Sequence, residues 1–271
     1  MTDKVILNLI RFLLVTGLLI LLVACAGQET KTSTEEKEKP SQVTQDENTE
    51  KGIKGTLLIF AERESASDKE SYTTRIFVSD DFLHMSNSYS PADFVLLNRS
   101  EHTIYNINRD DRSIFVIKKK PYDIKPPIEI NYVAKSQPSN AIPKIDGRQA
   151  THYRFYANDK HCYDSVVLGD DFLPDVLAAM REFRQVLAGE HAATVNKIPV
   201  DMLDACDLSL NVFHATKHME HGFPIREWDR KGYQRFLVDY RQDVSVPKEI
   251  FDLPKDFTQY TLEDMESGKV R

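Results

Sequence analysis

Short apolar runs separated by turn residues recur at about ten-residue spacing from residue 56 to residue 168, a pattern typical of an all-β segment. The connections between these runs are too short for crossover helices, so neighbouring strands should pair antiparallel. The pattern predicts nine strands in this part of the chain: Thr56–Glu62, Thr73–Ser79, Phe82–Asn87, Phe94–Asn98, Thr103–Asn108, Ser113–Lys118, Ile128–Ala134, Gln149–Asn158 and Cys162–Leu168.

Apolar residues at helical spacing then predict two helices. Asp171 is placed to cap the first helix, which ends at Gly189. The second helix is expected from about Val200 to Glu220, with Gly222 at its end.

Two further strands and an ordered closing segment follow the helices. The strands are predicted at Phe223–Asp229 and Gln234–Arg241, and the closing segment at Val246–Pro254. The expected fold class is α+β, mainly β: a curved antiparallel sheet or half-open barrel of about 11 strands with two covering helices.

Several predicted strands are apolar on both faces, which is unusual for an antiparallel sheet with one solvated face. A half-open barrel with an apolar interior explains the pattern, and so does a fully packed core without a cavity. The sequence does not say which strand face would line an interior. Candidate ligand-contacting residues on these strands are Leu58, Phe60, Phe94, Leu96, Phe115 and Ile117.

The first 24 residues have the organisation of a secretory signal peptide. Lys4 and Arg11 precede the apolar run 12–24, and Leu22-Val23-Ala24-Cys25 resembles the lipobox of bacterial lipoproteins. This resemblance implies acylation of Cys25, and Ala26 after it implies export to the outer membrane, facing the periplasm. An uncleaved anchor over residues 5–24 is the alternative.

Residues 26–54 are polar apart from Ala26, Val43 and Ile53. Such a segment buries too little apolar surface to offset chain entropy, so a disordered tether is expected after Cys25. Its reach is roughly 30 Å. A helix formed by its Glu/Lys run is the alternative. The folded domain is expected over residues 55–262, with a flexible tail over 263–271.

Charge narrows the classes of partner. The 271 residues contain 35 Lys and Arg against 42 Asp and Glu, a net charge of −7. Removal of Asp3, Lys4 and Arg11 with the signal peptide would leave −8. Nucleic acid needs clustered cations, so it is not an expected partner. The expected partners are the membrane, through the N-terminal acyl chains, and a lipid or a protein.

Two short segments follow the helices: Phe-Pro-Ile-Arg-Glu-Trp at 223–228 and Val-Pro…Ile-Phe-Asp-Leu-Pro at 246–254. Together with the order of the predicted elements, they resemble the LolA/LolB-like lipoprotein-carrier superfamily, over about residues 55–260. It implies an open barrel, lined with apolar side chains and lidded by helices, that can hold acyl chains. The established carriers have an additional helix before the first strand, where this chain has its polar tether.

Of the three cysteines, Cys162 and Cys206 remain after Cys25 is assigned to acylation. An even pair in an oxidising compartment favours a disulfide, and two buried free thiols are the alternative. A bridge would close a loop of about 45 residues, worth roughly 4 kcal/mol in the loop-entropy treatment.

His214, His218 and His221 are spaced i, i+4 and i+7 on the second predicted helix. Two imidazoles one turn apart can share a metal ion, but the spacing lacks the glutamate of the H-E-x-x-H motif. A solvated helix face is the favoured interpretation. Lys118-Lys119-Lys120 is more typical of a strand-end gatekeeper than of a contact with anionic lipid.

No nucleophile elbow, phosphate-binding loop, dinucleotide fingerprint or Cys-x-x-Cys motif occurs in the sequence. We therefore expect neither an enzyme nor a cofactor. The leading hypothesis is a non-catalytic binding or assembly lipoprotein that holds an apolar ligand. The alternatives are a structural or protein-interaction lipoprotein with a filled core, and a metal-binding protein or metal-dependent enzyme that uses His214 and His218.

Overall fold

The computed structural model describes residues 52–270 apart from 69, 122, 139–141 and 143. The predicted signal peptide, Cys25 and almost all of the predicted tether lie outside these residues. Ile53–Arg271 forms a compact unit by itself. The sheet, the disulfide and the apolar clusters described below all lie within it, so this unit carries its own core.

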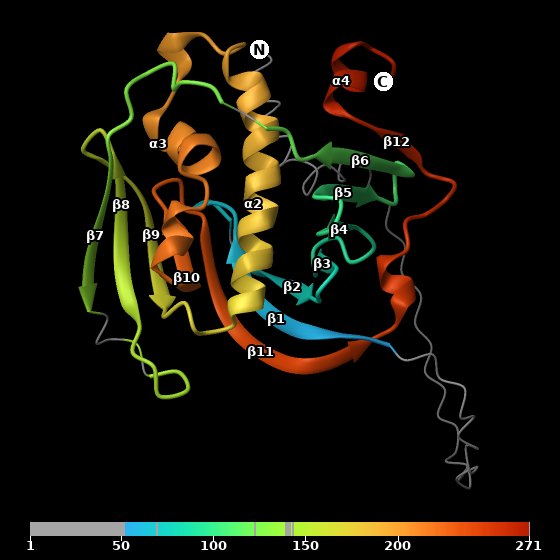
Figure 1. The fold of residues 1–271 in the computed structure, drawn as a ribbon, viewed down its shortest axis with the longest axis horizontal. Helices are drawn as coiled ribbons and strands as arrows, with labels where there is room; N and C mark the ends of the chain where they lie inside the picture. Colours follow the sequence, from blue (N-terminus) through green and yellow to red (C-terminus); the bar gives the residue numbers. More distant parts are fainter. Residues whose placement is uncertain (1–51, 69, 122, 139–141, 143, 271) are drawn as a thin grey trace, which may run out of the picture. The chain divides into compact units, whose positions relative to one another are not determined.

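The described strands form one curved, unclosed sheet of twelve (Figure 1), in the order β12-β6-β5-β4-β3-β2-β1-β11-β10-β9-β8-β7. Neighbours pair antiparallel, as predicted, except for β12, which pairs parallel with β6. The mainly β fold with covering helices is thereby confirmed. The strands are β1 (Ile53–Arg63), β2 (Tyr72–Val78), β3 (Phe82–Asn87), β4 (Phe94–Asn98), β5 (Thr103–Asn108), β6 (Ser113–Lys118), β7 (Tyr132–Pro138), β8 (Thr151–Ala157), β9 (Lys160–Leu168), β10 (Phe223–Asp229), β11 (Gln234–Val246) and β12 (Thr258–Tyr260).

Two strands differ clearly from their predicted bounds. β7 begins at Tyr132, because Ile128 and Ile130 pack against an apolar cluster of the helical region instead of joining the sheet. β11 continues to Val246, because its second half pairs with the beginning of β1, where Ile53 lies opposite Val246.

The first predicted helix is α2 (Pro174–Val195), but neither of its predicted ends is correct. Asp171 does not cap it; Leu173, in a left-handed conformation, precedes Pro174, and the Asp171 carboxylate pairs with Arg148 instead. Gly189 lies inside the helix. A Cβ atom there would come within 2.7 Å of the Lys120 carbonyl oxygen, so this glycine permits close packing and does not end the helix.

The second predicted helix, Val200–Glu220, is wrong as one element. The chain forms four short segments there: η1 (Val200–Met202), α3 (Ala205–Leu208), η2 (Ser209–Phe213, a π-helical turn) and η3 (Lys217–His221). The break after η1 has a local cause: Leu203 is extended, and the Asp204 carboxylate accepts hydrogen bonds from the backbone N–H groups of Cys206 and Asp207. Asp204 therefore starts a new helix by capping it.

Both faces of β2–β6 are covered, which accounts for the two-faced apolar strands in that part of the sheet. The inner face carries α2, as Figure 1 shows, and side chains of α2 and of this face form the main apolar cluster. The outer face of β2–β6 is covered by the C-terminal segment, which includes η4 (Lys248–Phe251) and buries Phe251 in a second apolar cluster. α2 and the C-terminal segment thus take the place that a second sheet would have.

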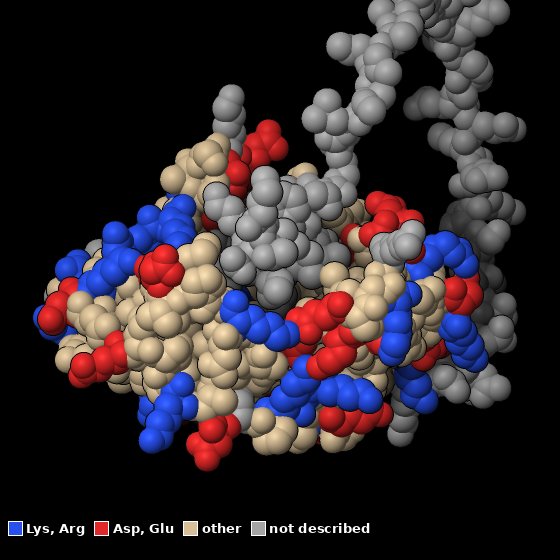
Figure 2. Space-filling model, turned by 90° about the horizontal axis from the view of Figure 1, so that it is seen from above, with Lys and Arg blue, Asp and Glu red and all other residues tan. Residues whose placement is uncertain are grey.

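Ordered structure continues beyond residue 262, where the predicted domain ends. α4 (Leu262–Glu266) begins with a capping box formed by Thr261 and Asp264, and Leu262 is buried. On the face shown in Figure 2, acidic and basic side chains are interspersed and do not segregate. Among the described residues, no helix has the length and apolar character needed to cross a bilayer.

Candidate functional site

Four of the six candidate ligand-contacting residues share the inner face of the sheet. Leu58 and Phe60 of β1, and Phe115 and Ile117 of β6, belong to the apolar cluster that includes α2. Their exposed fractions are 0, 1, 4 and 3%. These side chains come together because residues two apart in a strand point to the same face.

Phe94 and Leu96 lie on the outer face of β4 instead. They belong to the cluster that the C-terminal segment covers, and the Phe94 ring stacks on His84 at 4.9 Å. Their neighbours in β4, Val95 and Leu97, point to the inner face. The six candidates therefore form two separate surfaces, and the strand register divides them.

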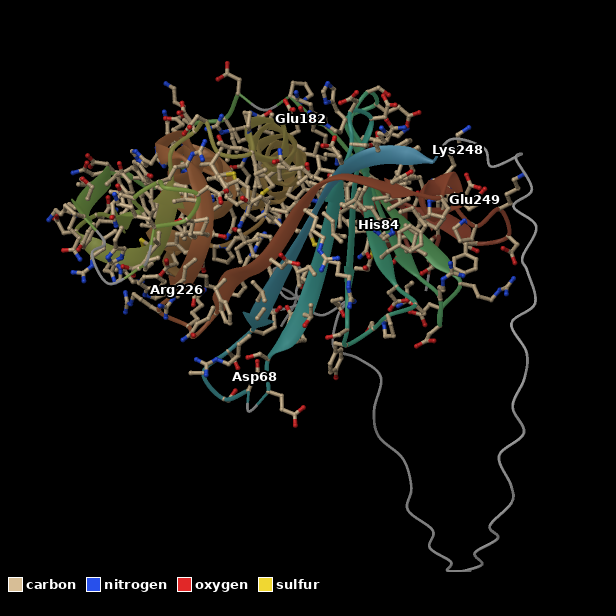
Figure 3. The ribbon with its side chains drawn as sticks, turned by 90° about the horizontal axis from the view of Figure 1, so that it is seen from below. Asp68, His84, Glu182, Arg226, Lys248 and Glu249 are labelled. Carbon is tan, nitrogen blue, oxygen red and sulfur yellow. A yellow bond between two sulfur atoms is a disulfide. The ribbon has the colours of Figure 1, made fainter. Side chains whose placement is uncertain are left out.

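The inner face is closed over by α2, which polar contacts hold to the loops at its flanks. Arg99, after β4, donates two hydrogen bonds to Glu182 of α2, Nε to Oε2 at 2.8 Å and Nη2 to Oε1 at 2.9 Å. Farther along α2, the Lys120 ammonium lies 2.8 Å from the Glu190 carboxylate. Figure 3 shows Glu182 on the opposite side of the sheet from Arg226 and His84.

A group of buried charged and polar residues adjoins this apolar cluster, and we call it the inner polar cluster: Glu62, Tyr163, His218, Glu227 and Arg235. The Arg235 guanidinium lies 3.8 Å from the centre of the Phe60 ring. It is 3.6 Å from Glu62 and 3.8 Å from Glu227, and the Tyr163 hydroxyl donates to Glu227 at 2.5 Å. The inner face is thus apolar under α2 and ionic beyond Phe60.

Burial shapes the protonation of this cluster. It raises the pKa of Glu62, while the nearby Arg235 acts in the opposite direction. It lowers the pKa of His218 to about 4, so this imidazole is neutral at pH 7. His218 is 3% exposed, and neither of its ring nitrogens has a hydrogen-bond partner among the described residues.

The three histidines do not form the predicted row on one helix. His214 stacks on Tyr132 at 4.7 Å and His221 stacks on Tyr153 at 4.2 Å, while His218 is buried behind them. The interpretation as a solvated face is therefore wrong for His218, because the helix breaks. Among the described residues, no three His, Cys, Asp or Glu side chains are placed to hold a metal ion.

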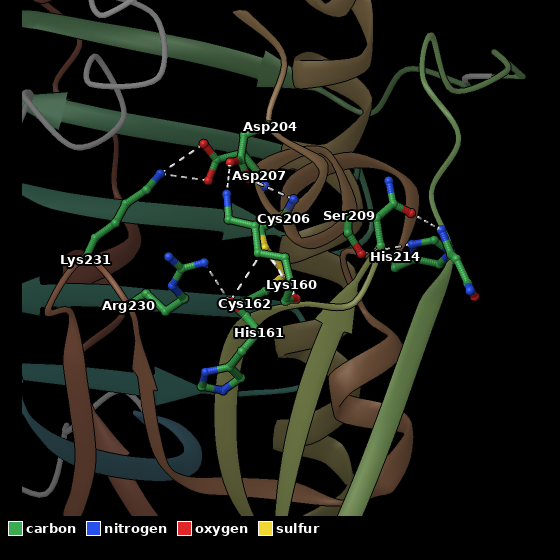
Figure 4. The surroundings of a disulfide bond; sticks show 12 residues. Lys160, His161, Cys162, Asp204, Cys206, Asp207, Ser209, His214, Arg230 and Lys231 are labelled. Atoms are coloured by element: carbon green, nitrogen blue, oxygen red, sulfur yellow. Dashed lines mark hydrogen bonds and ion pairs between the residues drawn. A yellow bond between two sulfur atoms is a disulfide. The ribbon is translucent and has the colours of Figure 1, made fainter.

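The predicted disulfide between Cys162 and Cys206 is present and joins β9 to α3. Figure 4 shows its surroundings, where Lys160 of β9 pairs with Asp204 and Lys231, between β10 and β11, pairs with Asp207 of α3 at 2.8 Å. The bridge fixes the broken helical region to the sheet next to the inner polar cluster.

The sequence pattern drew attention to His218 but did not indicate the inner polar cluster as a group. Glu62 is the last residue of the predicted strand Thr56–Glu62, and Glu227 lies within the predicted strand Phe223–Asp229. A charged residue within a largely apolar strand, such as Glu227, was a usable signal. Such a group is rarely buried without a partner, so it predicts a second charged residue nearby. Pairing Glu227 with Arg235 required the register of β10 on β11.

No protein-family model matches the sequence, and no curated protein matches it either. Solved structures similar to this chain include an uncharacterized conserved protein from Thermus thermophilus, with 8% identity over 77% of this chain and 91% of that chain and a TM-score of 0.38. PNGF-II matches at 8% identity, 79% and 32% coverage and a TM-score of 0.39. MucB matches at 10% identity, 76% and 59% coverage and a TM-score of 0.34. The chain thus spans about a third of the PNGF-II chain and three-fifths of the MucB chain. Membership of the LolA/LolB-like superfamily remains a prediction.

Proposed function

We propose that this chain is a non-catalytic binding lipoprotein. Acyl chains on Cys25 would anchor it to the periplasmic face of the outer membrane, and an apolar ligand of the acyl class would lie between the inner face of the sheet and α2. The observation that carries the proposal is the apolar inner face of β1–β6, which meets one long helix and no second sheet among the described residues.

α2 is the element that would move to admit such a ligand. Its contacts with the flanking loops at Glu182 and Glu190 are ion pairs, and neither end of α2 is tied by the disulfide. The inner polar cluster adjoins the apolar face at Phe60, so a single-chain amphiphile would find polar partners at one end of its tail.

A second candidate function is a structural or protein-interaction lipoprotein with a filled core. The observation in its favour is the burial of Leu58 and Phe60, whose exposed fractions of 0 and 1% leave little of either side chain for a ligand while α2 is in place. The two functions differ in whether α2 exchanges its contacts with the sheet for contacts with a ligand.

Ligand binding can be tested with matched substitutions on β6. Ile117 faces α2, whereas Ile114 is equally buried in the outer cluster. Ile117→Ala and Ile114→Ala remove the same atoms, and each should cost about 2–5 kcal/mol of stability. We expect only Ile117→Ala to change the uptake of a fluorescent fatty acid, measured in parallel with native mass spectrometry of the detergent-free protein.

Absence of co-purifying lipid together with absence of fatty-acid uptake would favour the filled core. The anchor is tested separately with Cys25→Ala in the full chain. We expect this variant to remain unprocessed and to lose its normal membrane fractionation, measured by mass spectrometry and by separation of inner and outer membranes. Unchanged processing and fractionation would refute the anchor.

A further inference from the structure

Cations and exposed apolar side chains meet on the outer face of β7–β11, the side turned away from α2. Strand register places them as neighbours: Lys135 lies opposite Arg154, and Arg226 lies opposite Phe236. Figure 3 shows Arg226 on this outer side. We call this surface the outer basic patch, formed by Lys135, Arg154, Arg226, Trp228, Phe236 and Val238.

The cations of the patch rest on aromatic rings. The Lys135 ammonium lies 4.8 Å from the centre of the Tyr156 ring, and the Arg226 guanidinium lies 5.2 Å from that of Trp228. Lys135 and Arg226 are both exposed. A cation on a ring keeps its hydrogen-bond donors available to an anion that approaches from solvent, because the ring takes none of them.

Asp239, which follows Val238 on β11, is 43% exposed and pairs with Arg241 at 3.2 Å. Asp164 lies within the patch and is withdrawn from solvent. Its side chain is 3% exposed, and its two carboxylate oxygens lie 2.7 Å from Nε2 of His152 and 2.6 Å from Nε2 of His161. Arg154, half exposed, is 3.5 Å away. The patch therefore presents positive charge outward, although the whole chain carries a net charge of −7.

Two apolar side chains project beside the cations. Phe236 is 46% exposed and lies opposite Arg226, and Val238, two residues farther along β11, is 58% exposed. Exposed apolar and aromatic side chains flanked by Lys and Arg are the composition of surfaces that lie at a lipid–water interface.

We propose that the outer basic patch docks on the surface of an anionic phospholipid bilayer. The cations would pair with lipid phosphates, and Phe236 and Val238 would enter the headgroup region. Net negative charge repels the remaining surface from the same bilayer, so docking would orient the domain. The inference goes beyond the proposed function and rests on it only for the choice of membrane. The proposed anchor at Cys25 is 28 residues before β1, so the anchoring membrane is the nearest one.

The test uses residues 53–271, which carry their own core and contain no acylated cysteine. Vesicles of phosphatidylcholine with and without phosphatidylglycerol are mixed with this protein and separated by flotation. We expect binding that requires phosphatidylglycerol and weakens with salt. Trp228 is the chain's one tryptophan, so its fluorescence should shift to the blue and be quenched by brominated lipid.

Substitutions with matched controls identify the surface. Lys135→Gln/Arg226→Gln removes two cations that contact rings. A tenfold change in affinity corresponds to roughly 1.4 kcal/mol, so the loss of both cations should weaken vesicle binding about 30-fold. The control Lys197→Gln/Lys217→Gln changes net charge equally, elsewhere on the surface. Phe236→Ser/Val238→Ser should likewise weaken binding, in contrast to Val200→Ser/Met202→Ser, whose side chains are 63 and 57% exposed.

Three results would overturn the docking surface: equal binding to vesicles without phosphatidylglycerol, equal losses in patch and control variants, or vesicle binding with unchanged Trp228 fluorescence. Failure of the proposed function is distinguishable, because fatty-acid uptake depends on the inner face and should be unchanged in Lys135→Gln/Arg226→Gln. A variant that loses vesicle binding but takes up the fatty acid normally would therefore be defective in the patch alone.

Discussion

Removal of the Cys162–Cys206 disulfide, which lies in a third apolar cluster with Phe155 and Tyr163, should destabilise the protein strongly. The two cysteines are 44 residues apart in sequence, and they join β9 to the short helix α3. A cross-link over a loop of this length lowers the entropy of the unfolded chain, which corresponds to about 4 kcal/mol of stability at 25 °C. We therefore expect Cys162→Ser/Cys206→Ser to lower the free energy of unfolding by about 4 kcal/mol.

The assay is urea denaturation of residues 53–271, followed by far-ultraviolet circular dichroism and by Trp228 fluorescence. The dependence of the unfolding free energy on urea should become steeper in the variant, because its unfolded chain is less compact and exposes more surface. The wild-type protein under reducing conditions serves as the control and should approach the variant. A loss of less than about 1 kcal/mol, or an unchanged urea dependence, would show that the bridge does not act through the unfolded chain.

Two further predictions concern buried residues. The pKa of His218 is about 4 in the folded protein and near 6.5 in the unfolded chain. As pH falls from 6.5 to 4, only the unfolded chain binds a proton at this residue. The free energy of unfolding should therefore decline by on the order of 3 kcal/mol over that window. His218→Leu should remove this part of the acid sensitivity in denaturation curves recorded at pH 7 and pH 4.5, and an unchanged pH dependence would contradict a buried neutral imidazole. Phe251→Ala should cost about 3–5 kcal/mol, because the ring is 7% exposed and stacks on Phe82 at 4.8 Å; a thermal denaturation midpoint equal to that of the wild type would mean that the C-terminal segment does not cover the outer cluster.

Local sequence determined most of the sheet. Five strands, Phe82–Asn87, Phe94–Asn98, Thr103–Asn108, Ser113–Lys118 and Phe223–Asp229, have their predicted bounds. β-prone runs bounded by turn residues are sufficient for this, because hairpins pair neighbours in sequence. The number of cysteines and the predicted oxidising compartment were likewise sufficient to predict the Cys162–Cys206 bridge.

Helix boundaries depended on contacts that the sequence pattern does not contain. Glycine often ends a helix, but Gly189 lies inside α2, where it allows the helix to approach the Lys120 backbone closely. Asp171 pairs with Arg148 instead of capping α2. Asp204 breaks a continuous apolar stripe by capping a new helix. In each case a long-range or capping contact outweighed a propensity difference, which is about 1 kcal/mol at most for residues other than proline.

The apolar pattern of a strand such as Ile114–Ile117 already requires that both of its faces be covered, since no other arrangement removes both sets of apolar side chains from water. What covers each face depends on long-range packing: α2 covers Phe115 and Ile117, and the C-terminal segment covers Ile114 and Val116. The same holds for Arg235, Glu62 and Glu227, which come from three strands. Their burial together depends on the register of β1, β11 and β10, and a register is a property of paired strands that no single strand encodes.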